Sequence, residues 1–249
     1  MRTITELEIK SFNDFIDITR KYPGAYYRGH ADGKNWKLKP SIARILDKNK
    51  KFSLYSFSGW SGLEKNILNR FKRHAFPYLK TIPQSDIDWL VLGQHYGLPT
   101  RLLDWSENPL IALFFALSEI FNSESHVWII EPSYSWSEQM SLKKLKCIQL
   151  YFPKLLDNRI ISQRGCFTIQ PFFDDFKPII SLDEYFPQTE IGMGINDLVK
   201  VIIPNDKELK QYMFRQLLDL GIDFNFIYPD LNGLSRRIIY EIENSIDKF

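Results

Sequence analysis

Runs of β-branched and aromatic residues recur along the chain and predict its strands. The expected strands are Ala25–Arg28, Leu102–Trp105, His126–Glu131, Arg159–Ile169, Leu198–Ile203 and Phe224–Tyr228. The runs are short and bounded by polar residues, glycine or proline, as strands of a globular domain usually are.

Capping signals between these runs predict helices. Ser85–Asp88 has the form of a capping box, which opens a helix expected to close near Gly97. Asn205–Glu208 has the same form and predicts a helix that continues to Gly221. Each glycine follows the last periodic residue, where a left-handed residue commonly ends a helix.

The most apolar segment follows Asn108. This residue is a suitable N-cap, and Pro109 suits the first helical position because its missing N–H is not needed there. The next residues, LIALFFAL, are apolar on every side of a helix. They predict a central, buried helix.

The order of these elements is irregular and lacks a steady alternation of strands and helices. This favours an α+β fold with mixed or antiparallel sheets and flanking helices over a doubly wound sheet. A length of 249 residues permits one large domain or two modest ones. Because no linker rich in Gly, Ser or Pro occurs, we expect a single domain over 1–249 and interpret Glu131–Ser141 as a surface excursion.

The net charge of +2 argues against an extensive, strongly basic surface for nucleic-acid binding but permits a local basic patch. Lys65, Arg70, Lys72 and Arg73 could form such a patch, or they could be the solvated side of a helix. The chain has only 2 cysteines and 4 scattered histidines, so neither a disulfide framework nor a metal site is expected.

The location of the protein is inferred from what the sequence lacks. Its first residues have no apolar core of a signal peptide. Its longest apolar stretch, Leu110–Leu117, is far too short to cross a bilayer. We therefore expect a cytoplasmic protein that does not interact with membranes.

The first motif that suggests a chemical function is YYRGH at residues 26–30. Arg28 offers a planar fork of donors suited to phosphate or carboxylate. Gly29 beside it lacks a Cβ, so a ligand can approach the backbone closely. The alternative is an arginine at a strand end that pairs with a carboxylate, followed by a turn glycine.

Two further polar clusters interrupt apolar segments. Asp104, Trp105 and Ser106 stand at the end of a predicted strand and before the buried helix, whose N-terminus favours anions. The alternative is that they only organise the turn. Ser162–Gly165 interrupts the predicted strand Arg159–Ile169, which suggests a bulge or a close backbone approach, or else an ordinary hairpin turn.

These segments together resemble the FRG domain, a prokaryotic family named for its Phe/Tyr-Arg-Gly motif. The resemblance rests on YYRGH, HYGLPTRLLDWSENPLIALFFAL, RIISQRGCFTI and GIDFNFIYPDLNGL. These stretches span roughly residues 20 to 240, so a domain core of about that extent is implied. Tyr27 occupies the position where many members have phenylalanine.

The order of the motifs also resembles, more distantly, the arginine–serine–glutamate class of ADP-ribosyltransferases. That resemblance implies an ADP-ribosyltransferase-like fold and NAD as substrate, with no metal. Arg28 would hold the pyrophosphate, Ser106 with Asp104 would support the nicotinamide ribose, and Tyr27 or Trp105 would stack on the nicotinamide. The implied NAD-binding residues are Tyr27, Arg28, Gly29, Thr100, Arg101 and Trp105. The implied catalytic residues are Arg28, Asp104, Ser106 and Gln163.

The third motif departs from that class because it offers Gln163 in place of a glutamate. Glutamine can hydrogen-bond a ribose hydroxyl but brings no negative charge to the oxocarbenium-like transition state of nicotinamide release. Either Asp104 or another acid such as Glu107 fills this role, or the activity is altered or absent.

The leading hypothesis is a mono-ADP-ribosyltransferase that acts as a bacterial toxin or phage-defence effector on protein, RNA or DNA. Such an effector implies an antitoxin or chaperone as partner. The alternative is a non-catalytic module that binds a nucleotide or phosphate. A nuclease is the least supported reading, because no paired carboxylates with metal-ligand character stand out.

Overall fold

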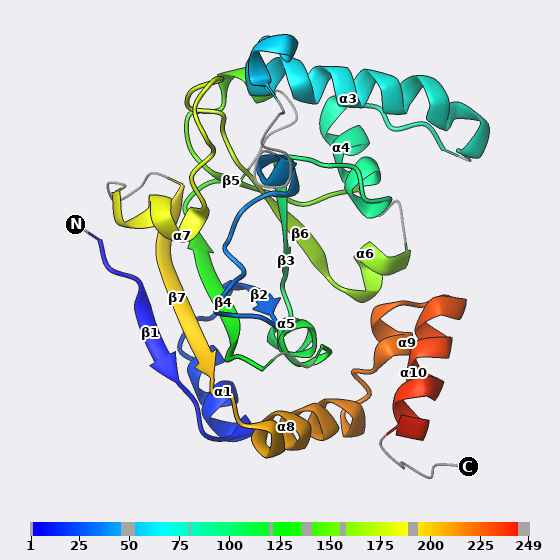
Figure 1. Ribbon diagram of the computed structural model, residues 1–249. Helices are drawn as coiled ribbons and strands as arrows, with labels where there is room; N and C mark the ends of the chain where they lie inside the picture. Colours follow the sequence, from blue (N-terminus) through cyan, green and yellow to red (C-terminus); the bar gives the residue numbers. More distant parts are fainter. Residues whose placement is uncertain are drawn as a thin grey trace.

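A seven-stranded sheet forms the centre of the computed structural model, which describes residues 2–45, 53–79, 81–119, 122–135, 141–154, 158–188 and 194–243 (Figure 1). Its strands are β1 (Thr5–Glu8), β2 (Tyr26–His30), β3 (Leu102–Ser106), β4 (Ser125–Pro132), β5 (Gln149–Tyr151), β6 (Gly165–Ile169) and β7 (Ile195–Ile203). They are ordered β1-β7-β4-β2-β3-β6-β5, with β1 parallel to β7 and every other pair antiparallel. The predicted α+β class with a mixed sheet is confirmed.

Helices of very different lengths surround the sheet. The α-helices are α1 (Phe12–Thr19), α3 (Gly59–Ala75), α4 (Asp86–His95), α5 (Pro109–Leu117), α6 (Asn158–Ser162), α7 (Leu182–Tyr185), α8 (Lys207–Asp219), α9 (Phe224–Ile227) and α10 (Leu231–Glu243). The 3₁₀ turns are η1 (Ser41–Ala43), η2 (Leu54–Phe57), η3 (Phe76–Tyr78), η4 (Leu142–Lys144) and η5 (Phe186–Gln188). Within the described ranges, no helix combines the length and apolar character needed to span a membrane.

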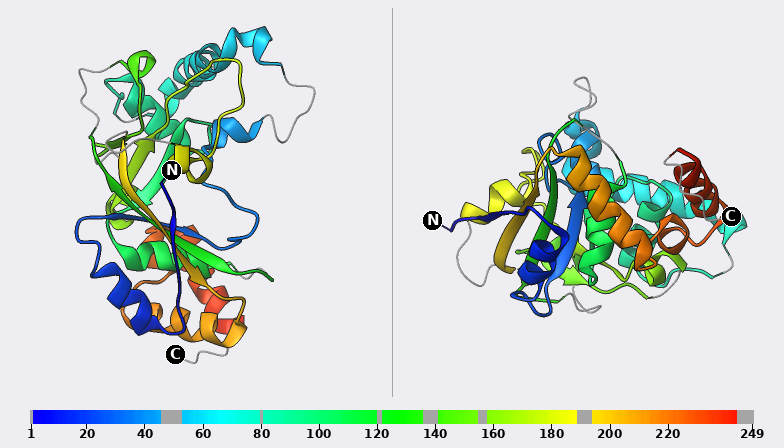
Figure 2. Two further views of the ribbon diagram at one scale, coloured as in Figure 1. Left: turned by 90° about the vertical axis from the view of Figure 1, so that its left-hand side faces the viewer. Right: turned by 90° about the horizontal axis from the view of Figure 1, so that it is seen from below.

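Two separate groups of helices cover the same face of the sheet. Around β2, β4 and β7, residues such as Val127 pack in one core with Phe114 of α5 and Phe214 of α8. Around β3 and β6, Leu102 packs in another core with Leu90 of α4. Tyr27 and Ser106 are paired across β2 and β3, so both cores lie on one face. Figures 1 and 2 agree that α3 and α8 lie at opposite ends of the molecule.

The other face of the sheet is closed by α7 and η5. Trp105 and Trp128 project into this core, where Leu182 and Phe186 pack against them. Because side chains alternate along a strand, Trp105 and its neighbour Asp104 point to opposite faces. This alternation decides which residues of β3 can reach the first face.

The capping signals were mostly accurate. Ser85 and Asp88 form the predicted capping box, in which the Ser85 hydroxyl accepts from the Asp88 N–H at 3.2 Å and the Asp88 carboxylate accepts from the Ser85 N–H at 3.1 Å. Asn108 caps α5 by accepting from the Leu110 N–H at 2.9 Å. The cap of α8 is one residue later than predicted: it is Asp206, whose carboxylate accepts from two backbone N–H groups of the first turn.

Two of the predicted strands are wholly or partly wrong. Only Gly165–Ile169 of the predicted strand 159–169 is extended, because α6 occupies the first part and Arg164 then adopts a left-handed conformation, φ 43°. Phe224–Ile227 is the helix α9, capped by Asp223, which accepts from the Phe226 N–H at 2.7 Å. A run of five mostly apolar residues does not distinguish strand from helix, and here the preceding cap decides.

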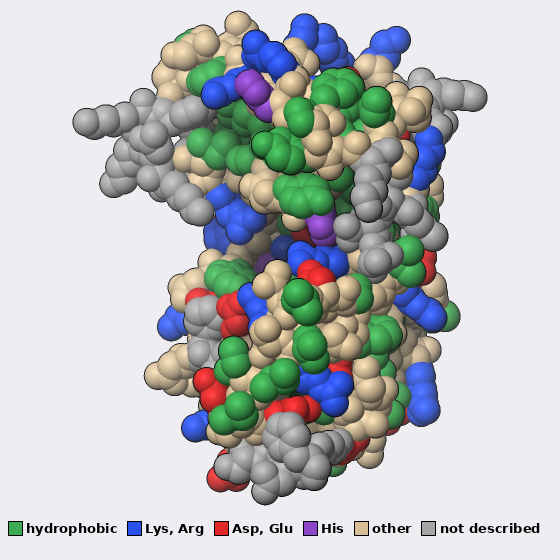
Figure 3. Space-filling model, turned by 90° about the vertical axis from the view of Figure 1, so that its right-hand side faces the viewer, with side chains coloured by type: hydrophobic (Ala, Val, Ile, Leu, Met, Phe, Trp, Pro, Cys, Tyr) green, Lys and Arg blue, Asp and Glu red, His purple; other side chains and the backbone are tan. Residues whose placement is uncertain are grey.

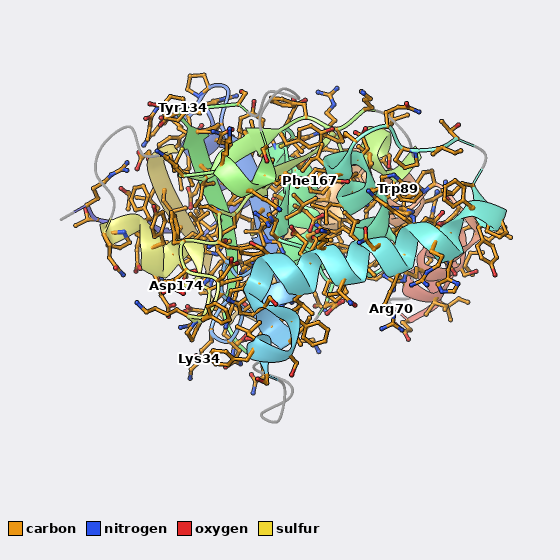
Figure 4. The ribbon with its side chains drawn as sticks, turned by 90° about the horizontal axis from the view of Figure 1, so that it is seen from above. Lys34, Arg70, Trp89, Tyr134, Phe167 and Asp174 are labelled. Carbon is orange, nitrogen blue, oxygen red and sulfur yellow. The ribbon has the colours of Figure 1, made fainter. Side chains whose placement is uncertain are left out.

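The basic run on α3 is the solvated side of that helix. Lys65, Arg70 and Arg73 are exposed, whereas Leu63 and Leu68 are buried. Figure 4 shows Arg70 on the side of α3 away from Trp89 and Phe167. Lys72 is committed to an ion pair with Asp86 at 2.5 Å. These residues therefore lie on the solvent-exposed side of α3, and one of the four basic side chains is already paired with a carboxylate.

Candidate functional site

The sheet splits where β2 and β3 diverge. Tyr27 pairs with Ser106, and a continued antiparallel register would place Gly29 opposite Asp104, but no such pairing occurs in the described sheet. The guanidinium of Arg28 fills the gap: its Nη1 donates to the backbone carbonyl of Asp104 at 2.7 Å and to the Asp104 carboxylate at 3.4 Å. A side chain thus replaces the ladder hydrogen bonds that the two strands lack.

A cavity of about 320 Å³ opens at this split, between α4 on one side and α5 on the other. We call it the central cavity. Its polar lining residues include Arg28, Gln94, His95, Asp104, Ser106, Arg159 and Gln163. Its apolar and aromatic lining residues include Val91, Ile111, Phe115, Ile160, Phe167 and Tyr228. Figure 3 shows this side of the molecule hollowed at mid-height, with basic and histidine side chains around the hollow.

Arg28 keeps one terminal nitrogen available for a ligand. Its Nε donates to Nε2 of His30 at 3.1 Å and its Nη1 serves Asp104, whereas Nη2 has no partner among the described residues. Burial lowers the pKa of Arg28, Asp104 opposes this shift, and the nearby cation Arg44 adds to it. The guanidinium nevertheless stays protonated, because the pKa of arginine lies far above neutral pH.

Asp104 is the carboxylate of the central cavity. Its side chain is 61% exposed, and one oxygen accepts from Nε2 of Gln94 at 2.7 Å. The Thr100 hydroxyl in turn donates to the Gln94 amide oxygen. Thr100, Gln94, Asp104 and Arg28 therefore form a chain of hydrogen bonds that holds the carboxylate in one orientation.

Ser106 organises the turn into α5. Its hydroxyl donates to the backbone carbonyl of Gln163 at 2.8 Å and accepts from the Asn108 N–H at 3.0 Å. Ser106 is 5% exposed, so little of it is open to the cavity. These contacts join the end of β3 to the loop before β6.

Gln163 stands on that same loop, at the end of α6. Its amide nitrogen donates to the carbonyl of Ile227 at 3.1 Å, which ties the loop to α9. Its amide oxygen remains as a hydrogen-bond acceptor at the cavity wall. The motifs around Arg28, Asp104, Ser106 and Gln163, far apart in sequence, therefore meet at one cavity, as their grouping in one site requires.

Residues 24–125 match the family model of the FRG domain. The match supports assignment to the FRG family and covers the chain from β2 to the start of β4. No curated protein and no solved structure matches the chain. Gln163, Arg159 and Tyr228 lie beyond the FRG match, so the site combines this region with later elements.

The two aromatic residues expected to stack on a ring are mostly buried. Tyr27 is 4% exposed, packs with α5, and donates its hydroxyl to the Tyr22 carbonyl at 3.2 Å. Trp105 is 3% exposed, and its indole N–H donates to Thr168 at 2.9 Å. Both line the cavity, but partly exposed rings at its wall, such as that of Tyr228, are freer to contact a ligand.

Thr100 and Arg101 do not line the central cavity. Thr100 is fully buried and acts through Gln94. Arg101 is 3% exposed and forms an ion pair with Glu64 of α3, in which Nε lies 2.7 Å from Oε1. Arg101 therefore joins the residue before β3 to α3, and no contact of its side chain with the central cavity supports the predicted contact with NAD.

Sequence reasoning missed several residues of the site, among them Gln94, Phe115, Arg159 and Tyr228. Gln94 is the one polar residue of the LVLGQ run before His95, which could have marked it. Phe115 lies in a helix that is apolar on all sides, so the sequence does not show which ring faces a cavity. Arg159 and Tyr228 stand in segments whose secondary structure was predicted wrongly.

Neither a reactive thiol nor a metal cluster marks the site. Cys166 lines the cavity but is fully buried, and burial raises the pKa of its thiol, so the nucleophilic thiolate is not formed near neutral pH. In the parts of the chain that the structure describes, no group of three or more His, Cys, Asp or Glu side chains could hold a metal.

The buried His30 of the FRG region predicts a loss of stability in mild acid. Burial, Arg28, His126 and Arg44 together hold its pKa well below the ordinary value of 6.5. The unfolded chain binds a proton at His30 below about pH 6.5 and the folded chain does not, so the free energy of unfolding falls as the pH drops below 6.5.

We expect this loss to approach about 1.4 kcal/mol per pH unit from His30 alone. In His30→Gln, whose amide oxygen can still accept from Arg28, that part of the dependence should disappear. Urea unfolding at pH 7.5 and pH 5.5 measures both proteins. Equal losses in the two proteins would show that His30 is protonated in the folded state.

Proposed function

We propose that this protein is an NAD-consuming ADP-ribosyltransferase. The observation that carries the proposal is the meeting, in one cavity of about 320 Å³, of an arginine with an unused donor, an oriented carboxylate and aromatic walls. Arginine suits a diphosphate, a carboxylate suits a developing sugar cation, and apolar and aromatic walls suit a planar ring.

The proposed reaction uses these groups in different roles. Nη2 of Arg28 binds an oxygen of the NAD diphosphate. The nicotinamide ring occupies the part of the cavity near Phe115 and Tyr228, which places its ribose beside Asp104. The bond between nicotinamide nitrogen and ribose C1′ breaks, and its electron pair neutralises the positive charge on the ring.

The sugar then carries oxocarbenium character, which the Asp104 carboxylate stabilises electrostatically. An acceptor nucleophile forms the new bond to C1′ and releases its proton to solvent. Asp104 takes the role that a glutamate has in the arginine–serine–glutamate class, because Gln163 carries no charge. Gln163 retains an amide oxygen that can accept from a ribose hydroxyl.

An NAD-consuming enzyme depletes its own host, so the proposal includes a role as toxin or phage-defence effector. It also includes an antitoxin or chaperone that keeps the site closed until it is needed. The acceptor is a protein or a nucleic acid, and the assay below includes both.

The decisive measurement is nicotinamide release from NAD by purified protein, with cell extract or RNA supplied as acceptor. We expect wild type to release nicotinamide and Asp104→Asn to release it at least about a hundredfold more slowly. Asparagine keeps the size of the side chain and removes its charge, so NAD affinity should change little. Arg28→Ala should abolish release, with thermal unfolding as a check on its fold.

Arg73→Ala is the matched surface control and should behave like wild type, since Arg73 is exposed on α3. Absence of release by folded wild type with every acceptor would overturn the proposal. The second candidate, a module that binds nucleotide without turnover, is favoured by one observation: Gln163 is uncharged and its amide is tied to Ile227. It predicts NAD binding by wild type without any nicotinamide release.

A further inference from the structure

A second compartment of about 480 Å³ also adjoins the Arg28–Asp104 pair. It shares Arg28, Gln94 and Asp104 with the central cavity and is otherwise lined mainly by Ser41, Arg44 and the turn 97–99. We call it the Arg44 compartment. Arg28 therefore lines two cavities, each large enough for part of a ligand.

The Arg44 compartment holds more positive than negative charge. Arg28 and Arg44 both line it, and Asp104 is the only carboxylate among its lining residues within the described chain. Asp104 is already engaged by Gln94 and Arg28. Arg44 is exposed and has neither an ion pair nor a hydrogen bond to another described side chain. Two guanidinium groups held near each other repel, and a bound anion would relieve that repulsion.

The backbone around Arg44 is held firmly. The Thr100 N–H donates to the Ser41 hydroxyl at 2.9 Å, and the Ile42 N–H donates to the Thr100 carbonyl at 3.0 Å. Ile42 is fully buried. These bonds fasten η1 to the loop before β3, so Arg44 projects from a fixed position and less freedom is lost when it binds a ligand.

Several other donors on the wall are already used. The Gly97 N–H donates to the Gln94 carbonyl at 3.0 Å, and the Leu98 N–H donates to the Gly93 carbonyl at 2.8 Å. Pro99 has no N–H, and the Gln94 amide nitrogen donates a hydrogen bond to the Asp104 carboxylate. Among the described residues, the side-chain donors that remain for a ligand in this compartment are therefore Nη2 of Arg28 and the guanidinium of Arg44.

We propose that the Arg44 compartment binds a diphosphate group, with Arg28 and Arg44 as its two cations. A diphosphate presents oxygens on two linked phosphorus atoms, so one can meet Nη2 of Arg28 while the other meets the fork of Arg44. The inference deepens the proposed function by placing the diphosphate of the substrate between the two cavities. It concerns binding alone and does not need NAD cleavage.

The test is isothermal titration of purified protein with inorganic pyrophosphate, ADP and adenosine. We expect pyrophosphate and ADP to bind wild type, and Arg44→Gln to weaken both by about tenfold or more. Adenosine, which lacks phosphate, should bind far more weakly than ADP. Binding of ADP with none of pyrophosphate would contradict recognition of the diphosphate itself and assign the compartment to the nucleoside.

Arg73→Gln is the matched control, because it makes the same change in charge at an exposed position of α3. It should leave both affinities within about twofold of wild type, since exposed charges far from a site are screened by salt. Equal weakening by Arg73→Gln and Arg44→Gln would overturn the inference, as would undiminished binding by Arg44→Gln.

The outcomes separate this inference from the proposed function. Wild type could bind pyrophosphate in a way that depends on Arg44 and yet release no nicotinamide. That result would support the diphosphate site and contradict the proposed transferase activity. Alternatively, wild type and Arg44→Gln could release nicotinamide equally while neither binds pyrophosphate. That result would support the proposed transferase activity and contradict the diphosphate site.

Discussion

Gly29→Ala is expected to destabilise the protein by more than about 3 kcal/mol, enough to prevent folding in a marginally stable chain. A Cβ built on Gly29 would lie 1.9 Å from the carbonyl oxygen of Ala112 and 2.6 Å from the backbone nitrogen of Ala116. Both atoms belong to the backbone of α5, so no side-chain rotation relieves the clash. The whole helix would have to move away from β2.

Gly165→Ala is the matched control for this prediction. It lies in β6 at the same cavity, and its added Cβ would meet nothing closer than the Ile160 carbonyl at 3.7 Å. Its free energy of unfolding should stay within about 1 kcal/mol of wild type. Urea unfolding, or soluble yield if the first variant does not fold, measures the difference. Similar stability of both variants would mean that α5 does not pack against β2 as described.

Arg101→Ala is expected to destabilise the protein by about 3–5 kcal/mol. The side chains of Arg101 and Glu64 are 3% and 9% exposed, so removal of the arginine leaves a buried carboxylate without its partner. The Arg101 guanidinium also lies 3.7 Å from the ring centroid of Phe172, and this contact would be lost as well. Thermal or urea unfolding provides the measurement.

The double variant Arg101→Met with Glu64→Leu tests the physical reason. It removes both charges and fills the space with apolar groups, so it should be clearly more stable than Arg101→Ala. Arg73→Ala should have little effect, since Arg73 is exposed. A loss below about 1 kcal/mol for Arg101→Ala would show that the ion pair does not hold α3 to β3.

Local signals predicted the parts of the fold that depend on neighbouring residues. Ser85 and Asn108 were recognised as caps because a cap bonds to backbone groups within three residues of itself. The apolar helix α5 followed from composition alone, since a helix without a polar side must be buried. By contrast, α9 was predicted as a strand because burial of Phe224 and Ile227 against α5 and α8 is decided by distant residues.

The candidate site shows the same division between local and distant information. YYRGH and the 97–109 block marked Arg28 for its fork of donors and Asp104 for its place before a helix N-terminus, and both residues line the central cavity. The resemblance to ADP-ribosyltransferases grouped Thr100 and Arg101 with them, although Arg101 forms an ion pair with Glu64 of α3. Adjacent residues on a strand point to opposite faces, and the sequence does not state which face is open.

The sequence by itself determined the α+β class, the main caps, the buried helix α5 and the FRG motifs, because each depends on local bonding or on composition. Only the tertiary structure decided that β2 and β3 separate after Tyr27 and Ser106, that Arg28 bridges the gap, and that Gln94, Tyr228 and Arg44 face it. These residues come from elements far apart in the chain. Their meeting depends on how the helices pack on the sheet, which is a property of the whole molecule.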